Sequence, residues 1–161
     1  MRTILFSITL LLLLGSCQSS PTADLSPKDL MPYGIPVTVL APDSVAVKST
    51  DLGGIIKDVT LKGEDGRYDL QVMASSATSN DLARVKAEQL ASVKGSRYFS
   101  KLIKEEVNGF LYEMALDSTT LNYGFRYIVL QGDQEIVFQS GMASTLALQE
   151  AERMYEAVKQ Q

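Results

Sequence analysis

The fold is predicted mainly from the segment FLYEMALDSTTLNYGFRYIVLQGDQEIVFQ, residues 110–139. Apolar and polar side chains alternate along three successive runs, which is the pattern of β-strands with one buried face. The short polar segment Gln131-Gly132-Asp133-Gln134 separates the last two runs. Connections this short join antiparallel neighbours, because parallel strands need longer crossovers. The stretch therefore predicts an antiparallel meander.

Turn signals upstream of this stretch extend the same pattern. Asn108-Gly109 predicts a type I′ hairpin turn, because both residues tolerate the positive φ that such a turn requires. GEDG at 63–66 predicts a second hairpin loop. The other expected strands cover residues 37–40, 45–48, 55–62, 68–72 and 99–107.

Two segments have helical rather than alternating periodicity. Ser79-Asn80-Asp81 supplies N-cap side chains before a run at 82–93 in which apolar residues recur at helical spacing, and Gly95 fits the C′ position. Ser144 or Thr145 is expected to cap a second helix. The inner face of this second helix is expected to consist of Ala147, Ala151, Met154, Tyr155 and Val158.

The order of strands, helix, strand meander and helix predicts an α+β domain, an antiparallel β-sheet flanked by two amphipathic helices. The segments YGIPVTV at 33–39, YFSKLIKEEVNGFLYEMAL at 98–116 and LALQEAERMYEAV at 146–158 follow one another in a way that resembles the PsbP-like fold. Envelope proteins of the DcrB-like group share that fold. The resemblance implies a binding or assembly adaptor, and it brings no site motif to carry over.

The N-terminal segment MRTILFSITLLLLLGSC has the three parts of a secretory leader. Arg2 supplies the positive start, an apolar run covers residues 4–14, and small residues close it. A helix needs about 20 apolar residues to cross the roughly 30 Å core of a bilayer. Because the run is much shorter, we expect a signal peptide rather than a transmembrane anchor.

The end of this leader, Leu14-Gly15-Ser16-Cys17, resembles the lipobox of bacterial lipoproteins. The resemblance implies signal cleavage between Ser16 and Cys17 and attachment of diacylglycerol to the Cys17 thiol, with an acyl chain such as palmitate on the new amino group. By analogy with Gram-negative sorting, Gln18 after the cysteine favours the outer membrane, whereas Asp there favours inner-membrane retention. With one acid in QSSPTAD, we expect the periplasmic face.

These features divide the chain into three parts. Residues 1–16 are expected to be the signal peptide, residues 17–32 a flexible tether rich in Ser and Pro, and residues 33–161 a single α+β domain. A tether of this length has a root-mean-square span of roughly 20 Å. The domain would therefore work close to a bilayer surface.

The composition excludes several classes of chemistry. There is no histidine, so Ser-His-Asp catalysis and histidine metal sites are ruled out, and the single cysteine allows neither an intrachain disulfide nor a cysteine zinc site. The net charge of −4 argues against nucleic-acid binding, which needs clustered Lys and Arg. We expect no cofactor and no metal.

Each candidate site residue outside the leader has a structural interpretation that requires no catalytic or binding role. Glu105-Glu106 are adjacent on a strand, so they point to opposite faces and do not converge on one substrate bond. Glu64-Asp65 belong to a turn, and Gly53-Gly54 lack the lysine of a phosphate-binding loop. Lys94 and Arg97 complement a helix C-terminus. The stripe Tyr123, Phe125 and Tyr127 is interpreted as a buried sheet face, with a ligand pocket as the alternative.

Two functions remain. The first is a lipid-anchored cell-envelope module that binds a protein partner in a non-enzymatic, adaptor role. The alternative is a periplasmic carrier of a small apolar or aromatic ligand held between sheet and helix. An enzyme is the outsider, since only carboxylates, lysines and tyrosines are left for catalysis. The sequence assigns no ligand-binding residue to either function.

Overall fold

The computed structural model describes residues 21–141 and 144–159. The strands are β1 (Ser26–Asp29), β2 (Thr38–Ala41), β3 (Val45–Leu52), β4 (Ile56–Gly63), β5 (Asp69–Ser76), β6 (Phe99–Glu105), β7 (Gly109–Ala115), β8 (Leu121–Gln131) and β9 (Gln134–Ser140). The helices are α1 (Leu82–Lys94), α2 (Leu148–Ala157) and the short 3-10 helix η1 (Met31–Tyr33). The chain is of the α+β class, as its periodicity predicts.

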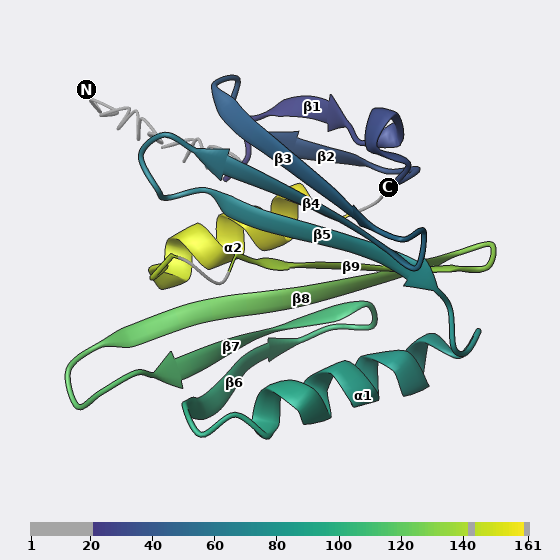
Figure 1. Cartoon of the computed structure of the whole chain (residues 1–161). Helices are drawn as coiled ribbons and strands as arrows, with labels where there is room; N and C mark the ends of the chain where they lie inside the picture. The colour runs from purple at the N-terminus through teal and green to yellow at the C-terminus, as the bar shows by residue number, and fades with distance from the viewer. Residues whose placement is uncertain (1–20, 142–143, 160–161) are drawn as a thin grey trace, which may run out of the picture.

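Seven strands form one antiparallel sheet in the order β3-β4-β5-β9-β8-β7-β6. The expected meander is confirmed, because β6, β7, β8 and β9 are successive neighbours. β9 then pairs with β5, with Val72 opposite Phe138, and this pairing joins the meander to the β3–β4–β5 meander that precedes α1. Figure 1 shows the resulting twisted sheet, with β1 and β2 as a separate hairpin.

The two helices pack on different sets of sheet residues. Val85 of α1 packs with Ile128 and Val137, and Val93 of the same helix packs with Phe110 and Tyr112. α2 belongs to the larger core cluster, which also contains residues of the β1–β2 hairpin and the side chains of β8 and β9 that alternate with those under α1. In Figure 1, α1 lies below β6 and β7, and α2 lies near β5 and β9.

The aromatic stripe of β8 lies mostly in this larger core. Phe125 and Tyr127 are buried, and both rings meet the Tyr155 ring of α2 edge-on, with centroids 5.8 Å apart in each pair. Edge-to-face contacts of this kind add to the apolar burial itself. They also fix the position of the Tyr155 ring within the core.

The structure corrects the expected extent of the flexible tether. Residues 26–29 form β1 against β2, and Leu30 is 1% exposed in the main core. A hydrogen bond of 2.6 Å from the Tyr68 hydroxyl to the Leu40 carbonyl ties this hairpin to the sheet. The folded domain therefore begins earlier than residue 33, because the hairpin partner of β2 lies within the segment taken as the tether.

The turn between β6 and β7 also differs from expectation. None of the described non-glycine residues has a positive φ, and Gly109 is not among the glycines that do, so this is not a type I′ turn. The Glu106 amide donates to the Gly109 carbonyl, and β7 begins at Gly109. Gly109 is instead required by packing, because a Cβ there would lie 2.4 Å from the Arg126 carbonyl oxygen.

Smaller corrections concern element ends. Ile55 lies in the β3–β4 turn and is 73% exposed, whereas Val59 and Leu61 are buried as expected. Gly95 caps α1 in the right-handed rather than the left-handed region, with φ of −72°. The second helix begins after Ala147, so Ala147 is not on its inner face; Ala151, Met154, Tyr155 and Val158 are buried as expected.

Candidate functional site

A cleft of about 850 Å³ runs along the outer face of α2. Gln149, Glu152 and Glu156 recur at helical spacing along one face of α2, and Lys159 lies two residues after the helix ends. The rest of the lining comes from Pro21 and Thr22 at the start of the described chain, Leu40 of β2, Lys104 of β6, Leu111 of β7 and Tyr155. We call this feature the α2 cleft. Its volume lies in the range of ligand-binding sites.

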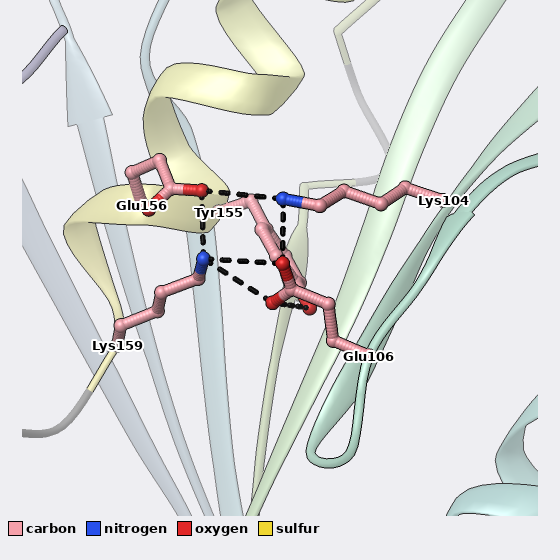
Figure 2. Close-up of polar contacts among 5 residues, drawn as sticks. All are labelled: Lys104, Glu106, Tyr155, Glu156 and Lys159. Atoms are coloured by element: carbon pink, nitrogen blue, oxygen red, sulfur yellow. Dashed lines mark hydrogen bonds and ion pairs between the residues drawn. The ribbon is translucent and has the colours of Figure 1, made fainter.

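Four charged side chains close a ring at one end of the α2 cleft (Figure 2). Lys104 Nζ lies 2.6 Å from Glu106 Oε1 and 3.7 Å from Glu156 Oε1. Lys159 Nζ lies 3.2 Å from Glu106 Oε2 and 2.7 Å from Glu156 Oε1. Charges of opposite sign therefore alternate around the ring, which joins the C-terminal end of α2 to the end of β6.

Tyr155 lies beneath this ring of charges. Its hydroxyl donates a 3.0 Å hydrogen bond to Glu106 Oε2, and its aromatic ring faces both Lys104 Nζ, at 5.6 Å from the centroid, and Lys159 Nζ, at 5.0 Å. A cation over the face of a tyrosine ring is attracted by the ring's electron density. Tyr155 thus contacts both lysines and one glutamate of the ring of charges. We call these five residues the Glu106 cluster.

Burial and hydrogen bonds within the Glu106 cluster shift the pKa values of Glu106, Lys159 and Tyr155. The hydrogen bond from Lys104, with those from Lys159 and Tyr155, lowers the pKa of Glu106 to about 2. Burial opposes charge on Lys159, but its bonds to Glu156 and Glu106 raise its pKa overall. Burial, then the hydrogen bond to Glu106, raises the pKa of the Tyr155 hydroxyl well above its ordinary value. A general acid or base needs a pKa near the working pH, and the shifts of Glu106, Lys159 and Tyr155 all move away from neutrality.

The expectation that Glu105 and Glu106 point apart is confirmed. Glu105 Oε1 lies 3.0 Å from Lys86 Nζ of α1, whereas Glu106 meets Lys159 and Tyr155 at the end of α2. The two adjacent carboxylates therefore form ion pairs on opposite faces of the sheet. The contacts of Glu106 with the two lysines and the tyrosine were not predicted, because only the fold brings these side chains to it.

The other sequence candidates are placed away from the α2 cleft. Glu64 and Asp65 lie in the β4–β5 turn, and Gly53 and Gly54 form the β3–β4 turn with positive φ. The Arg97 guanidinium lies over the Tyr98 ring after α1, 4.5 Å from its centroid. None of these residues lines the α2 cleft.

Tyr123 differs from the other two members of the aromatic stripe. It is half-buried, and its hydroxyl donates 3.1 Å to Glu113 Oε2, while Ser100 donates to Glu113 Oε1. The hydrogen bond from Ser100, with those from Lys101 and Tyr123, lowers the pKa of Glu113. Phe125 and Tyr127 of the stripe are therefore part of the buried core, whereas Tyr123 makes a polar contact with Glu113.

Ser16 and Cys17, the residues expected to carry signal cleavage and lipid attachment, lie outside the described residues. The residues of the α2 cleft were not identified from the sequence. Spacing along α2 was the available signal, since Gln149, Glu152, Glu156 and Lys159 follow a helical repeat on the side opposite the apolar residues. That pattern alone does not distinguish a cleft from an ordinary solvated helix face.

Within residues 21–141 and 144–159, no group of three or more His, Cys, Asp or Glu side chains is placed to hold a metal ion. In the same part of the chain, no helix combines the length and the apolarity needed to cross a membrane. Comparison of the chain with protein-family models, curated proteins and solved structures gives no match.

Proposed function

We propose that this protein is a lipid-anchored module of the bacterial cell envelope that binds a protein partner in the α2 cleft. The observation that carries the proposal is the position of Pro21 and Thr22, which line the cleft together with α2. Pro21 follows Cys17 by four residues in the sequence. The binding site and the proposed membrane anchor are therefore neighbours.

The separation of four residues between Cys17 and Pro21 limits the distance between the cleft and the membrane surface. Four extended residues span at most roughly 14 Å. Lipid attached to Cys17 would therefore hold Pro21, and the cleft that it lines, within that distance of the bilayer surface. Two or more acyl chains anchor a protein stably, because each buried methylene contributes about 0.8 kcal/mol. Gln18 after the cysteine supports the outer membrane, and the single acid in QSSPTAD supports its periplasmic face.

The proposal includes a PsbP-like arrangement of the domain. Its support is the succession of strands, α1, a four-stranded meander and α2, together with the resemblance of the segments at 33–39, 98–116 and 146–158. Domains of this kind act as adaptors, which agrees with a binding role.

A protein partner is favoured over a small apolar ligand by the burial of the cleft's apolar residues. Small-molecule sites bury most of the ligand surface against apolar walls. Leu111 is 1% exposed and Tyr155 is 0% exposed, so their surfaces are already covered. Phe125 and Tyr127, the alternative lining for an aromatic ligand, pack against Tyr155 instead. Along α2 and just after it, the cleft presents the polar side chains of Gln149, Glu152, Glu156 and Lys159, which suit a protein surface.

Site-specific photo-crosslinking in living cells tests the proposal. A benzophenone amino acid at Gln149, which is exposed and lines the cleft, is compared with the same residue at Glu88, which is exposed on α1. We expect one discrete adduct, identified by mass spectrometry, from position 149 and not from position 88. The adduct should disappear in the Cys17→Ala background. Absence of any adduct at 149 in the unaltered background would overturn the proposal.

A further inference from the structure

The charges around the α2 cleft are not balanced. The cleft and the Glu106 cluster together hold two lysines and three glutamates, so one negative charge is in excess; they are Lys104, Lys159, Glu106, Glu152 and Glu156. An excess of this sign attracts a cationic group and repels an anionic one. The net charge of −4 on the whole chain acts in the same direction.

The two lysines contribute little to binding a ligand, because their donors are engaged within the cluster. Lys159 Nζ contacts both carboxylate oxygens of Glu106 and Oε1 of Glu156, which matches the three N–H donors of an ammonium group. Lys104 Nζ contacts Glu106 and Glu156 as well. A ligand anion would have to displace these carboxylates.

Among the charged groups that line the α2 cleft, Glu152 is available to accept hydrogen bonds from a ligand. It is exposed on the cleft side of α2, and among the described residues no side chain is hydrogen-bonded or ion-paired with it. Glu156 lies one helical turn after Glu152 on the same face, and Gln149 lies three residues before Glu152. Both lysines contact Glu156 through Oε1, so its Oε2 and the Glu152 carboxylate are the acceptors left for a further cation.

The remaining lining suits the stem of a long cationic side chain. Pro21 and Leu40 present apolar surface, and Leu40 is only half-buried. Lysine and arginine pack their methylene groups along such surface while the charged head reaches a polar group. A compact cation without an apolar stem would leave Pro21 and Leu40 uncovered.

We infer that the α2 cleft binds an extended segment of a partner protein that inserts a lysine or arginine side chain, with its cationic head between Glu152 and Glu156 and its stem against Pro21 and Leu40. The inference rests on the proposed function and specifies the chemistry of the partner. Opposite charge across such a site also increases the rate of association and makes it dependent on salt.

Peptide titration of the full chain, purified in an uncharged detergent, tests the inference. The probes are the blocked peptide Ala-Leu-Lys-Leu-Ala and two matched peptides with norleucine or glutamate in place of lysine. We expect saturable binding of the lysine peptide, weakening as NaCl is raised. The norleucine peptide should bind more weakly by a factor of roughly 1.4 to 5, the range for an exposed charge pair, and the glutamate peptide more weakly still.

Two variants assign the binding to the cleft. Glu152→Gln should weaken binding of the lysine peptide by the same factor of roughly 1.4 to 5. Glu88→Gln, which removes an exposed carboxylate on α1, should leave its affinity unchanged. Equal binding of the three peptides, unaltered affinity in Glu152→Gln, or no binding of the lysine peptide would each overturn the inference.

The proposed function and this inference fail separately. If the photo-crosslinked adduct at Gln149 forms in cells but persists undiminished with Glu152→Lys, the cleft binds a partner through other chemistry and the inference is wrong. If no adduct forms, the proposed function is wrong whatever the peptides do.

Discussion

The Tyr155 hydroxyl donates a 3.0 Å hydrogen bond to Glu106 Oε2, and the two residues are 49 positions apart in the sequence. This bond joins the last turn of α2 to the residue that follows β6. It also places a buried tyrosine, which is part of the core, in direct contact with the carboxylate that both lysines share. Core packing and the charge arrangement of the α2 cleft therefore depend on the same side chain.

Replacing Tyr155 by Phe keeps the ring contacts with Phe125 and Tyr127 and removes only the hydroxyl. We expect the free energy of unfolding to fall by about 1.5 to 3 kcal/mol, the value of a hydrogen bond to a charged group. Urea unfolding followed by circular dichroism measures it. Tyr33→Phe is the matched control, because Tyr33 is exposed, and it should have no measurable effect. A loss as small as that of the control would contradict the importance of this bond.

The lowered pKa of Glu106 predicts a specific dependence of stability on pH. Its carboxyl has a pKa of about 2 in the folded state against an ordinary 4.5, so its contribution is fully present above pH 4.5 and is lost as pH falls towards 2. In Glu106→Gln this contribution is absent. We therefore expect the variant to be less stable at neutral pH and to show a flatter decline between pH 4.5 and 2. Parallel pH profiles of the two proteins would refute this assignment.

Two glycines predict opposite effects of the same substitution. Gly109→Ala places a methyl group 2.4 Å from the Arg126 carbonyl and 3.0 Å from the Tyr155 ring, so we expect a loss of about 1–3 kcal/mol. Gly95→Ala meets only ordinary contacts at 3.4 Å or more, in a backbone conformation that alanine adopts freely. It should stabilise the protein by about 0.4–1 kcal/mol by restricting the unfolded chain. Thermal unfolding of the two variants separates these outcomes, and a Gly109→Ala protein as stable as Gly95→Ala would show that the close approach is not real.

The proposed lipid anchor predicts the fate of Cys17 variants. Cys17→Ala removes the only thiol of the chain, so we expect no incorporation of radiolabelled palmitate and accumulation of the unprocessed precursor. Ser19→Ala, two residues further on, is the control and should be labelled and processed normally. Unchanged processing of Cys17→Ala would exclude the lipobox.

Local patterns determined much of the fold before any tertiary contact was known. The runs within residues 110–139 became β7, β8 and β9, because side chains on a strand alternate between faces and one face is buried. Asp81 caps α1 by accepting a hydrogen bond from the Arg84 amide, as its side chain predicts. Signals of this kind lie within a few residues of one another, so they are readable from the sequence.

Other features were decided only when distant segments met. Asn108-Gly109 has the composition of a type I′ turn, but the turn takes another form, and Gly109 is needed because the Arg126 carbonyl and the Tyr155 ring come close to it. Residues 26–29 look like part of a tether, yet they form a strand because β2 is there to pair with them. Neither outcome follows from local propensity.

The contacts of the candidate site belong to the second category. Sequence periodicity alone indicates that α2 has a polar face and that Glu105 and Glu106 point in opposite directions. Only the tertiary structure decided that Glu106 meets Lys159 and Tyr155 while Glu105 meets Lys86. The physical reason is that side-chain periodicity sets the face on which a residue lies, whereas the partner on that face depends on how helix and sheet pack, and many distant contacts together determine that packing.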